Sequence, residues 1–200
     1  MRQIIYIHGG SAYSQNESYL EQLRTMSLPV VGERPKRWSD SLAEDLGEGY
    51  EVLSPQMPNK YNSQYQEWKI WFERYTELLT GPTILIGWSQ GGMFLAKYLV
   101  ENEITWQIDS LYLVAAPFEA ADFHGEDGGD FIFDTSQLSA LSAKAPKIVI
   151  AHSEDDFVVP YEHALKYQQA LPAAEFMSFS DRNHFLLEDF PELIANIKQS

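Results

Sequence analysis

Short apolar runs recur along the chain and alternate with stretches in which apolar residues stand three or four positions apart. The runs, rich in β-branched residues, predict buried strands at residues 3–7, 50–54, 83–87, 110–116, 147–151 and 174–179. The other stretches predict helices at residues 17–26, 38–46, 65–79, 93–99, 161–171 and 185–197. Strands that alternate with helices are typical of a parallel sheet covered on both faces. We therefore predict an α/β fold, a three-layer α/β/α sandwich with about six mainly parallel strands.

The segment 117–146 follows neither pattern. Loops this long in compact domains tend to be binding loops or lids, so we predict that this segment forms a lid or a pocket wall. It is rich in aromatic and acidic residues, namely Phe118, Phe123, Phe131, Phe133, Glu119, Asp122, Glu126, Asp127 and Asp130. A calcium loop would show a regular alternation of oxygen ligands, which is missing from this sequence, and we predict no metal site.

Composition narrows the classes of partner. The chain has 200 residues, of which 44% are hydrophobic, and no Pro/Gly/Ser-rich linker divides it, so we expect a single domain over 1–200. A formal net charge of -15, without any cluster of Lys or Arg, argues against nucleic acid and anionic membranes as partners. The absence of cysteine excludes a thiol nucleophile, disulfides and thiolate metal sites.

The first apolar run, at residues 4–7, is too short to be a signal peptide or a membrane span, because His8 and two glycines interrupt it. We therefore expect a cytoplasmic protein with no membrane span.

A Gly-x-Ser-x-Gly-Gly sequence at residues 87–92 lies between a predicted strand and a predicted helix. A serine at the apex of such a turn, here Ser89, is held in a strained backbone conformation that exposes its hydroxyl. The motif alone is also consistent with an ordinary glycine-rich turn. A catalytic reading requires a base and an acid later in the chain.

Both groups follow later strands. Asp155 and Asp156 come after the fifth strand and His184 after the sixth, so folding of a parallel sheet brings them to the edge that holds Ser89. His163 is the other histidine after the acidic loop, but it falls inside a predicted helix, and we prefer His184 as the base. We assign the anchoring carboxylate to Asp156 and expect Asp155 to be a surface or loop-capping residue.

The negative charge of a tetrahedral intermediate requires donors already in position. We expect the backbone amide of Gln90, at the start of a helix, to be one donor. The second is expected from the loop after the first strand, at Gly10 or Ser11, although a plain strand-to-loop turn would explain the same sequence. His8 and His152 are expected to make structural hydrogen bonds.

Together these motifs resemble the α/β-hydrolase superfamily, and within it the small, nearly capless serine hydrolases of the retinoblastoma-binding-protein-nine and YdeN type. The resemblance spans essentially the whole chain and rests on residues 7–10, 87–92, 152–160 and 183–185. In that family the carboxylate four residues before a Val-Pro proline is catalytic, and this position is Asp156. The resemblance implies a reduced α/β-hydrolase sheet that lacks the first hairpin. Segments 11–37 and 118–133 depart from the family's pattern, and we expect them to shape the acyl pocket.

We therefore predict a serine hydrolase that cleaves a carboxylic ester, a thioester or an amide of a small acyl substrate, without metal or organic cofactor. Trp88, Phe118 and Phe157 are the side chains expected to contact substrate. Two alternatives stay open: a catalytically silent binding protein that recognises a protein partner through the aromatic loop, and an acyltransferase or perhydrolase that uses the same triad.

Overall fold

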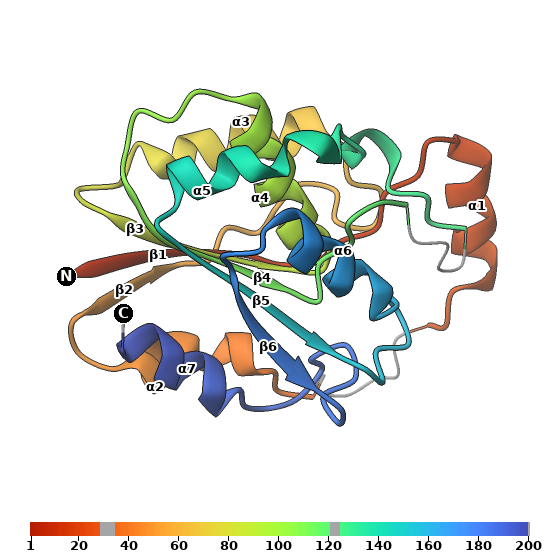
Figure 1. The fold of residues 1–200 in the computed structure, drawn as a ribbon. Helices are drawn as coiled ribbons and strands as arrows, with labels where there is room; N and C mark the ends of the chain where they lie inside the picture. The colour runs from red at the N-terminus through yellow and green to blue at the C-terminus, as the bar shows by residue number, and fades with distance from the viewer. Residues whose placement is uncertain (29–34, 121–124, 200) are drawn as a thin grey trace.

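The computed structural model describes residues 1–28, 35–120 and 125–199, and its centre is one parallel sheet (Figure 1). The six strands are ordered β2-β1-β3-β4-β5-β6, and every neighbouring pair is parallel. They are β1 (Arg2–Ile7), β2 (Tyr50–Leu53), β3 (Thr83–Trp88), β4 (Ile108–Val114), β5 (Lys147–Ser153) and β6 (Glu175–Phe179). The predicted α/β sandwich is confirmed, with a sheet that is entirely rather than mainly parallel.

Helices cover both faces of this sheet, as predicted. The α-helices are α1 (Asn16–Thr25), α2 (Leu42–Leu46), α3 (Tyr65–Thr76), α4 (Gln90–Glu101), α5 (Leu141–Lys144), α6 (Glu162–Ala170) and α7 (Pro191–Lys198). Short 3-10 helices occur at Trp38–Asp40, Gly129–Phe131 and Thr135–Ala140. Helices α3 to α6 lie on one face and α2 and α7 on the other (Figure 1). In the described part of the chain, no helix combines the length and the apolar character needed to cross a membrane.

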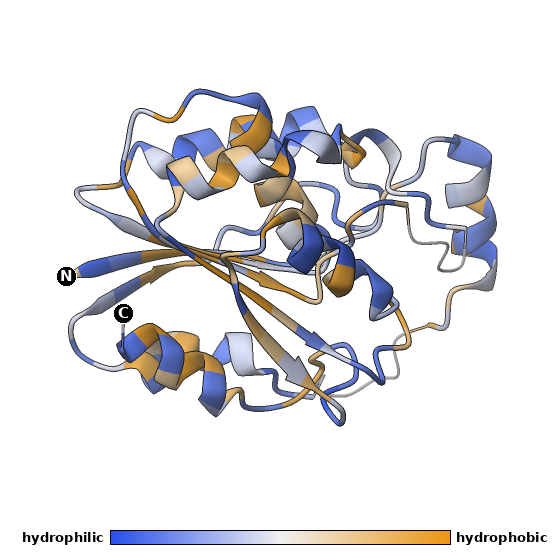
Figure 2. Cartoon of the chain, in the orientation of Figure 1, coloured by the Kyte–Doolittle hydropathy of each residue, from blue (hydrophilic) through white to orange (hydrophobic). Residues whose placement is uncertain are grey.

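The sheet divides the apolar core into two clusters. Successive side chains of a strand point to opposite faces, so Ile5 and Ile7 join the cluster under α3 and α4, whereas Ile4 and Tyr6 join the cluster under α2 and α7. The strands and the inner faces of the helices are correspondingly hydrophobic in Figure 2. Helix α1 buries none of its residues and lies beyond the sheet, on the side of the carboxyl ends of the strands (Figure 1).

The last helix is shorter than predicted. We expected it from residue 185, but α7 begins at Pro191, and Phe185 has a left-handed φ of 54° that no helix tolerates. Phe185 and Phe190 are nevertheless buried, and their rings lie 4.9 Å apart in the cluster under α7. The apolar spacing at these two residues therefore arises because a loop packs on the core, and not because the segment is helical.

The predicted irregular segment 117–146 is partly helical. Its second half forms a 3-10 helix and α5, because Leu138 and Leu141 are buried against α4. These helices are too short to show a periodic pattern in the sequence. Residues 121–124 of the predicted lid, with Asp122 and Phe123, lie outside the described residues. The helix predicted at 38–46 is a 3-10 turn followed by the five-residue α2.

Candidate active site

Ser89 occupies the sharp turn between β3 and α4. Its backbone has φ 54° and ψ -126°, a conformation that costs free energy in a residue other than glycine. The turn is held from both sides, since the Ser89 amide donates to the carbonyl of Val114 at 2.8 Å and its carbonyl accepts from the amide of Gly92 at 2.8 Å. Ser89 is half-buried, so its side chain stays reachable at the edge of the sheet.

The glycines of this turn are required by close approach. A Cβ atom on Gly91 would lie 2.2 Å from the carbonyl oxygen of Ile7, and one on Gly87 would lie 2.5 Å from the carbonyl oxygen of Gly91. Both contacts are with backbone, which cannot move away as a flexible side chain can. The glycine pattern therefore lets β1, β3 and α4 meet beneath Ser89.

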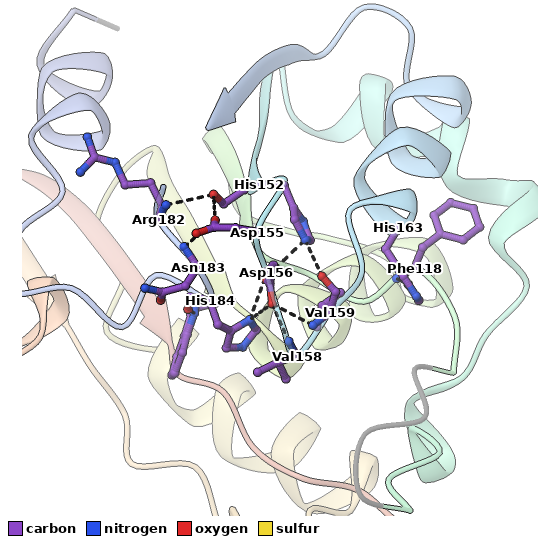
Figure 3. A network of polar contacts seen from close by, with 12 residues as sticks. Phe118, His152, Asp155, Asp156, Val158, Val159, His163, Arg182, Asn183 and His184 are labelled. Carbon is purple, nitrogen blue, oxygen red and sulfur yellow. Dashed lines mark hydrogen bonds and ion pairs between the residues drawn. The ribbon is translucent and has the colours of Figure 1, made fainter. Parts of the chain in front are cut away.

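Asp156 and His184, from the loops after β5 and β6, are in direct contact (Figure 3). The two oxygens of Asp156 lie 2.9 Å and 3.0 Å from Nδ1 of His184, and both residues are buried. The amides of Val158 and Val159 donate to the same carboxylate at 2.8 Å and 2.9 Å. A carboxylate held in this way accepts the Nδ1 proton of His184, so that Nε2 is the nitrogen left to accept a proton.

Asp155 ties the acid loop to the loop of His184 (Figure 3). Its carboxylate accepts from the Ser153 hydroxyl at 2.5 Å and from the amide of Asn183 at 2.9 Å. The Ser153 hydroxyl in turn accepts from the amide of Arg182 at 3.0 Å. Hydrogen bonds, that of Ser153 first, lower the pKa of Asp155. Asp155 therefore caps a loop, as we expected from the sequence, and it does so directly before His184.

Two other buried histidines contact the backbone of loops that follow β4 and β5. His152 has its Nε2 atom 2.9 Å from the carbonyl of Val159 and 3.4 Å from Asp156, and burial lowers its pKa. His163 accepts from the amide of Phe118 at 2.9 Å through Nδ1, and burial lowers its pKa as well. Both imidazoles are thus engaged by backbone groups.

The loop after β1 narrows the choice of the second oxyanion donor. The amide of Ser11 donates to the carbonyl of Lys60 at 2.8 Å, so it is already engaged. Gly10 lines the same cavity as Ser89 and Gln90 and is the remaining candidate. His8 fixes this loop, since Nε2 accepts from the amide of Met57 at 2.9 Å and Nδ1 lies 2.6 Å from the carbonyl of Gly9.

The cavity beside Ser89 is small, about 30 Å³, which is room for a water or two. Its wall includes Gly10, Ser89, Gln90, Val158, Glu119 and Glu126. The sequence placed the two glutamates in the predicted lid without singling out either of them. Within the described ranges, no group of three or more His, Cys, Asp or Glu side chains could hold a metal ion.

The three side chains expected to contact substrate are not among those that line this cavity. Trp88 donates from its indole nitrogen to the carbonyl of His184 at 3.0 Å, so it holds the base in place. Phe118 packs against Tyr167, with ring centroids 5.0 Å apart. Phe157 is 62% exposed. Each follows a strand or flanks a site residue in the sequence, but its neighbours across the fold decide where its side chain points.

Comparison with known proteins gives consistent matches. Residues 30–190 match the model of a family described as serine hydrolase. The chain is 28% identical over 151 residues to serine hydrolase RBBP9 of Rattus norvegicus, a match that covers 75% of this chain and 77% of that protein.

Solved structures share the fold. The ydeN gene product from B. subtilis superimposes with a TM-score of 0.72 at 17% identity, covering 100% of this chain and 98% of that one. A meta-cleavage product hydrolase from Pseudomonas fluorescens IP01 gives a TM-score of 0.66 at 14% identity. The match covers 100% of this chain and 90% of that one.

Proposed function

Since the chain belongs to the serine hydrolase family, we propose that it hydrolyses a carboxylic ester or a thioester through an acyl-Ser89 intermediate. One observation carries the proposal: the contact between Asp156 and His184 at the end of the sheet where β3 delivers the strained Ser89 turn. A serine hydroxyl is a poor nucleophile by itself and needs a neighbouring imidazole to accept its proton.

In the first half-reaction the Ser89 hydroxyl attacks the carbonyl carbon and gives its proton to Nε2 of His184. Asp156 stabilises the imidazolium that forms and keeps the ring in the required tautomer. The carbonyl oxygen gains negative charge and receives hydrogen bonds from the amides of Gln90 and Gly10. The tetrahedral intermediate then collapses, the bond to the leaving group breaks, and His184 returns its proton to the leaving alcohol or thiol.

In the second half-reaction a water molecule attacks the acyl-serine ester while His184 accepts one of its protons. Collapse of this second intermediate releases the carboxylic acid and restores the Ser89 hydroxyl. The N-terminus of α4 supports the negative charge in both steps, because Gln90 is its first residue and the helix dipole places partial positive charge there.

The experiment is covalent labelling with a fluorophosphonate, paired with a panel of p-nitrophenyl esters and acyl thioesters of graded chain length. We expect the parent protein to be labelled and the Ser89→Ala variant to be neither labelled nor active. Labelling of Ser89→Ala as strong as that of the parent would show that another residue is the nucleophile. The length at which turnover peaks measures the acyl group that the cavity accepts.

A further inference from the structure

The acidic stretch beside the cavity contains residues with different surroundings. Asp127 accepts from the amide of Ser14 at 2.8 Å and from the amide of Gly129 at 2.9 Å. Asp130 accepts from the amide of Tyr65, the first residue of α3, with its two oxygens at 2.9 Å and 3.0 Å. Both aspartates are therefore used to fasten this loop to the rest of the chain.

Glu126, from the same loop, faces the cavity of Ser89 instead. Among the described residues, it pairs with no cationic side chain. Its polar neighbours are the Ser11 hydroxyl, which forms a hydrogen bond with it, and the phenol of Tyr13. The other glutamate of the cavity, Glu119, is already paired with Lys166.

Gln90, which also lines this cavity, has one side-chain atom without a hydrogen-bond partner among the described residues. The Nε2 atom of Gln90 is buried and makes no hydrogen bond with any described residue, although Gln90 is only 5% exposed. Buried polar atoms are almost always hydrogen-bonded in folded proteins, so this orphaned atom in the wall of the active site is unusual. The cavity thus presents, next to Ser89, a carboxylate whose charge no cationic side chain of the described residues balances.

We propose that Glu126 determines substrate specificity and selects esters or thioesters that carry a positively charged ammonium group. The inference rests on the proposed hydrolysis at Ser89. A substrate bound at Ser89 removes water from the Glu126 carboxylate beside it, and this loss is offset only by a counter-charge or by strong hydrogen-bond donors. An anionic substrate would instead meet a like charge at close range.

The preference should depend on pH. Burial raises the pKa of Glu126 to about 7, against a smaller lowering by the hydrogen bond of Ser11. The cation preference therefore increases from pH 6 to pH 8, as Glu126 loses its proton. The facing groups keep their charge over this range, because the pKa of Tyr13 is raised to about 12 and that of Glu119 is lowered by its hydrogen bond with Lys166.

The test uses thioesters that share a butyryl group and differ in the end of the leaving group. Butyrylthiocholine is cationic, S-(3,3-dimethylbutyl) thiobutyrate is its neutral isostere, and S-butyryl-3-mercaptopropionate is anionic. A second series carries the same three end groups on the acyl chain of S-methyl thioesters. The readout is the ratio of kcat/KM between cationic and neutral members, in which the protonation of His184 cancels.

We expect the cationic member of at least one series to be favoured roughly tenfold or more at pH 8, as for the attraction between two opposite charges in a partly buried site. In Glu126→Gln this ratio should fall towards one and lose its pH dependence. The matched control is Glu103→Gln, which removes an exposed carboxylate near the far end of α4, about 18 Å away for a twelve-residue helix, and should keep the parent ratio.

Protection of Ser89 from the fluorophosphonate by choline, compared with 3,3-dimethylbutanol, measures the same preference without turnover. Neutral thioesters cleaved in a Ser89-dependent way, with no cation preference in either series, would overturn the role of Glu126 and leave the hydrolase proposal standing. Equal ratios in Glu126→Gln and Glu103→Gln would do the same. If the parent protein neither cleaves any thioester nor takes the label, both proposals fall.

Discussion

The imidazole of His184 lies 2.9 Å from the carboxylate of Asp156, although the two residues are 28 positions apart in the chain. The backbone also holds the carboxylate, because the amides of Val158 and Val159 both donate to Oδ1 of Asp156. Asp155 holds the segment that precedes His184. The pair is therefore positioned by an acid loop that fixes its own carboxylate and also holds the loop of His184.

This arrangement predicts different results for two neighbouring acids. Asp156→Asn should lower kcat by roughly 10⁴, because an amide no longer stabilises the imidazolium or the required tautomer of His184. Asp155→Asn retains an oxygen that can accept from Asn183 and should keep kcat within about tenfold of the parent. Ester hydrolysis measures both, and circular dichroism checks the fold. Loss of activity in Asp155→Asn alone would move the catalytic acid by one residue.

Trp88 offers a test of positioning. Trp88→Phe retains an aromatic ring but removes the donor to the carbonyl of His184. We expect kcat to fall roughly 10- to 100-fold as the base shifts, with KM little changed. A rise in KM as large as the fall in kcat would instead indicate that Trp88 contacts substrate, as the sequence suggested.

The turn beneath Ser89 can be tested by stability. Gly91→Ala places a Cβ atom 2.2 Å from the carbonyl oxygen of Ile7, so we expect the free energy of unfolding to fall by about 1–3 kcal/mol or more. Gly81→Ala is the matched control, since nothing lies within 4 Å of a Cβ at that position. Urea unfolding measures the free energy of unfolding of both variants. Equal values for the two would show that the turn beneath Ser89 has room for a Cβ atom.

His163 predicts how stability depends on pH. Burial lowers its pKa in the folded state, so below a pH of about 6.5 the unfolded chain binds a proton that the folded chain does not. Stability should therefore fall between pH 7 and pH 5, by up to about 1.4 kcal/mol per pH unit for this group.

The test variant is His163→Asn, whose side-chain oxygen can still accept from the amide of Phe118 but does not titrate. It should lose less stability than the parent between the two pH values in urea unfolding. His152 and His8 also have lowered pKa values, so the variant keeps part of the dependence. Parallel losses in parent and variant would mean that His163 is not the titrating group.

Much of the fold could be predicted from sequence because its signals are local. Each strand of the sheet is a contiguous apolar run, and alternation with amphipathic stretches leaves little choice but a parallel sheet covered on both faces. The same pattern fixes where Ser89, Asp156 and His184 fall, just after β3, β5 and β6. Apolar spacing misled us at Phe185 and Phe190, because a buried loop and a buried helix face can show the same spacing.

By itself, the sequence determined the strands, their parallel arrangement and the edge of the sheet at which the candidate residues gather. The tertiary structure alone decided which polar groups are already engaged. Glu126 and Asp127 are adjacent acids in the sequence, yet one faces a cavity and the other accepts from Ser14. Likewise, Gly10 and Ser11 were equal candidates for the second oxyanion donor. Only the hydrogen bond from the Ser11 amide to the carbonyl of Lys60 distinguishes them. The physical reason is that a hydrogen-bond partner far along the chain leaves no trace in local periodicity.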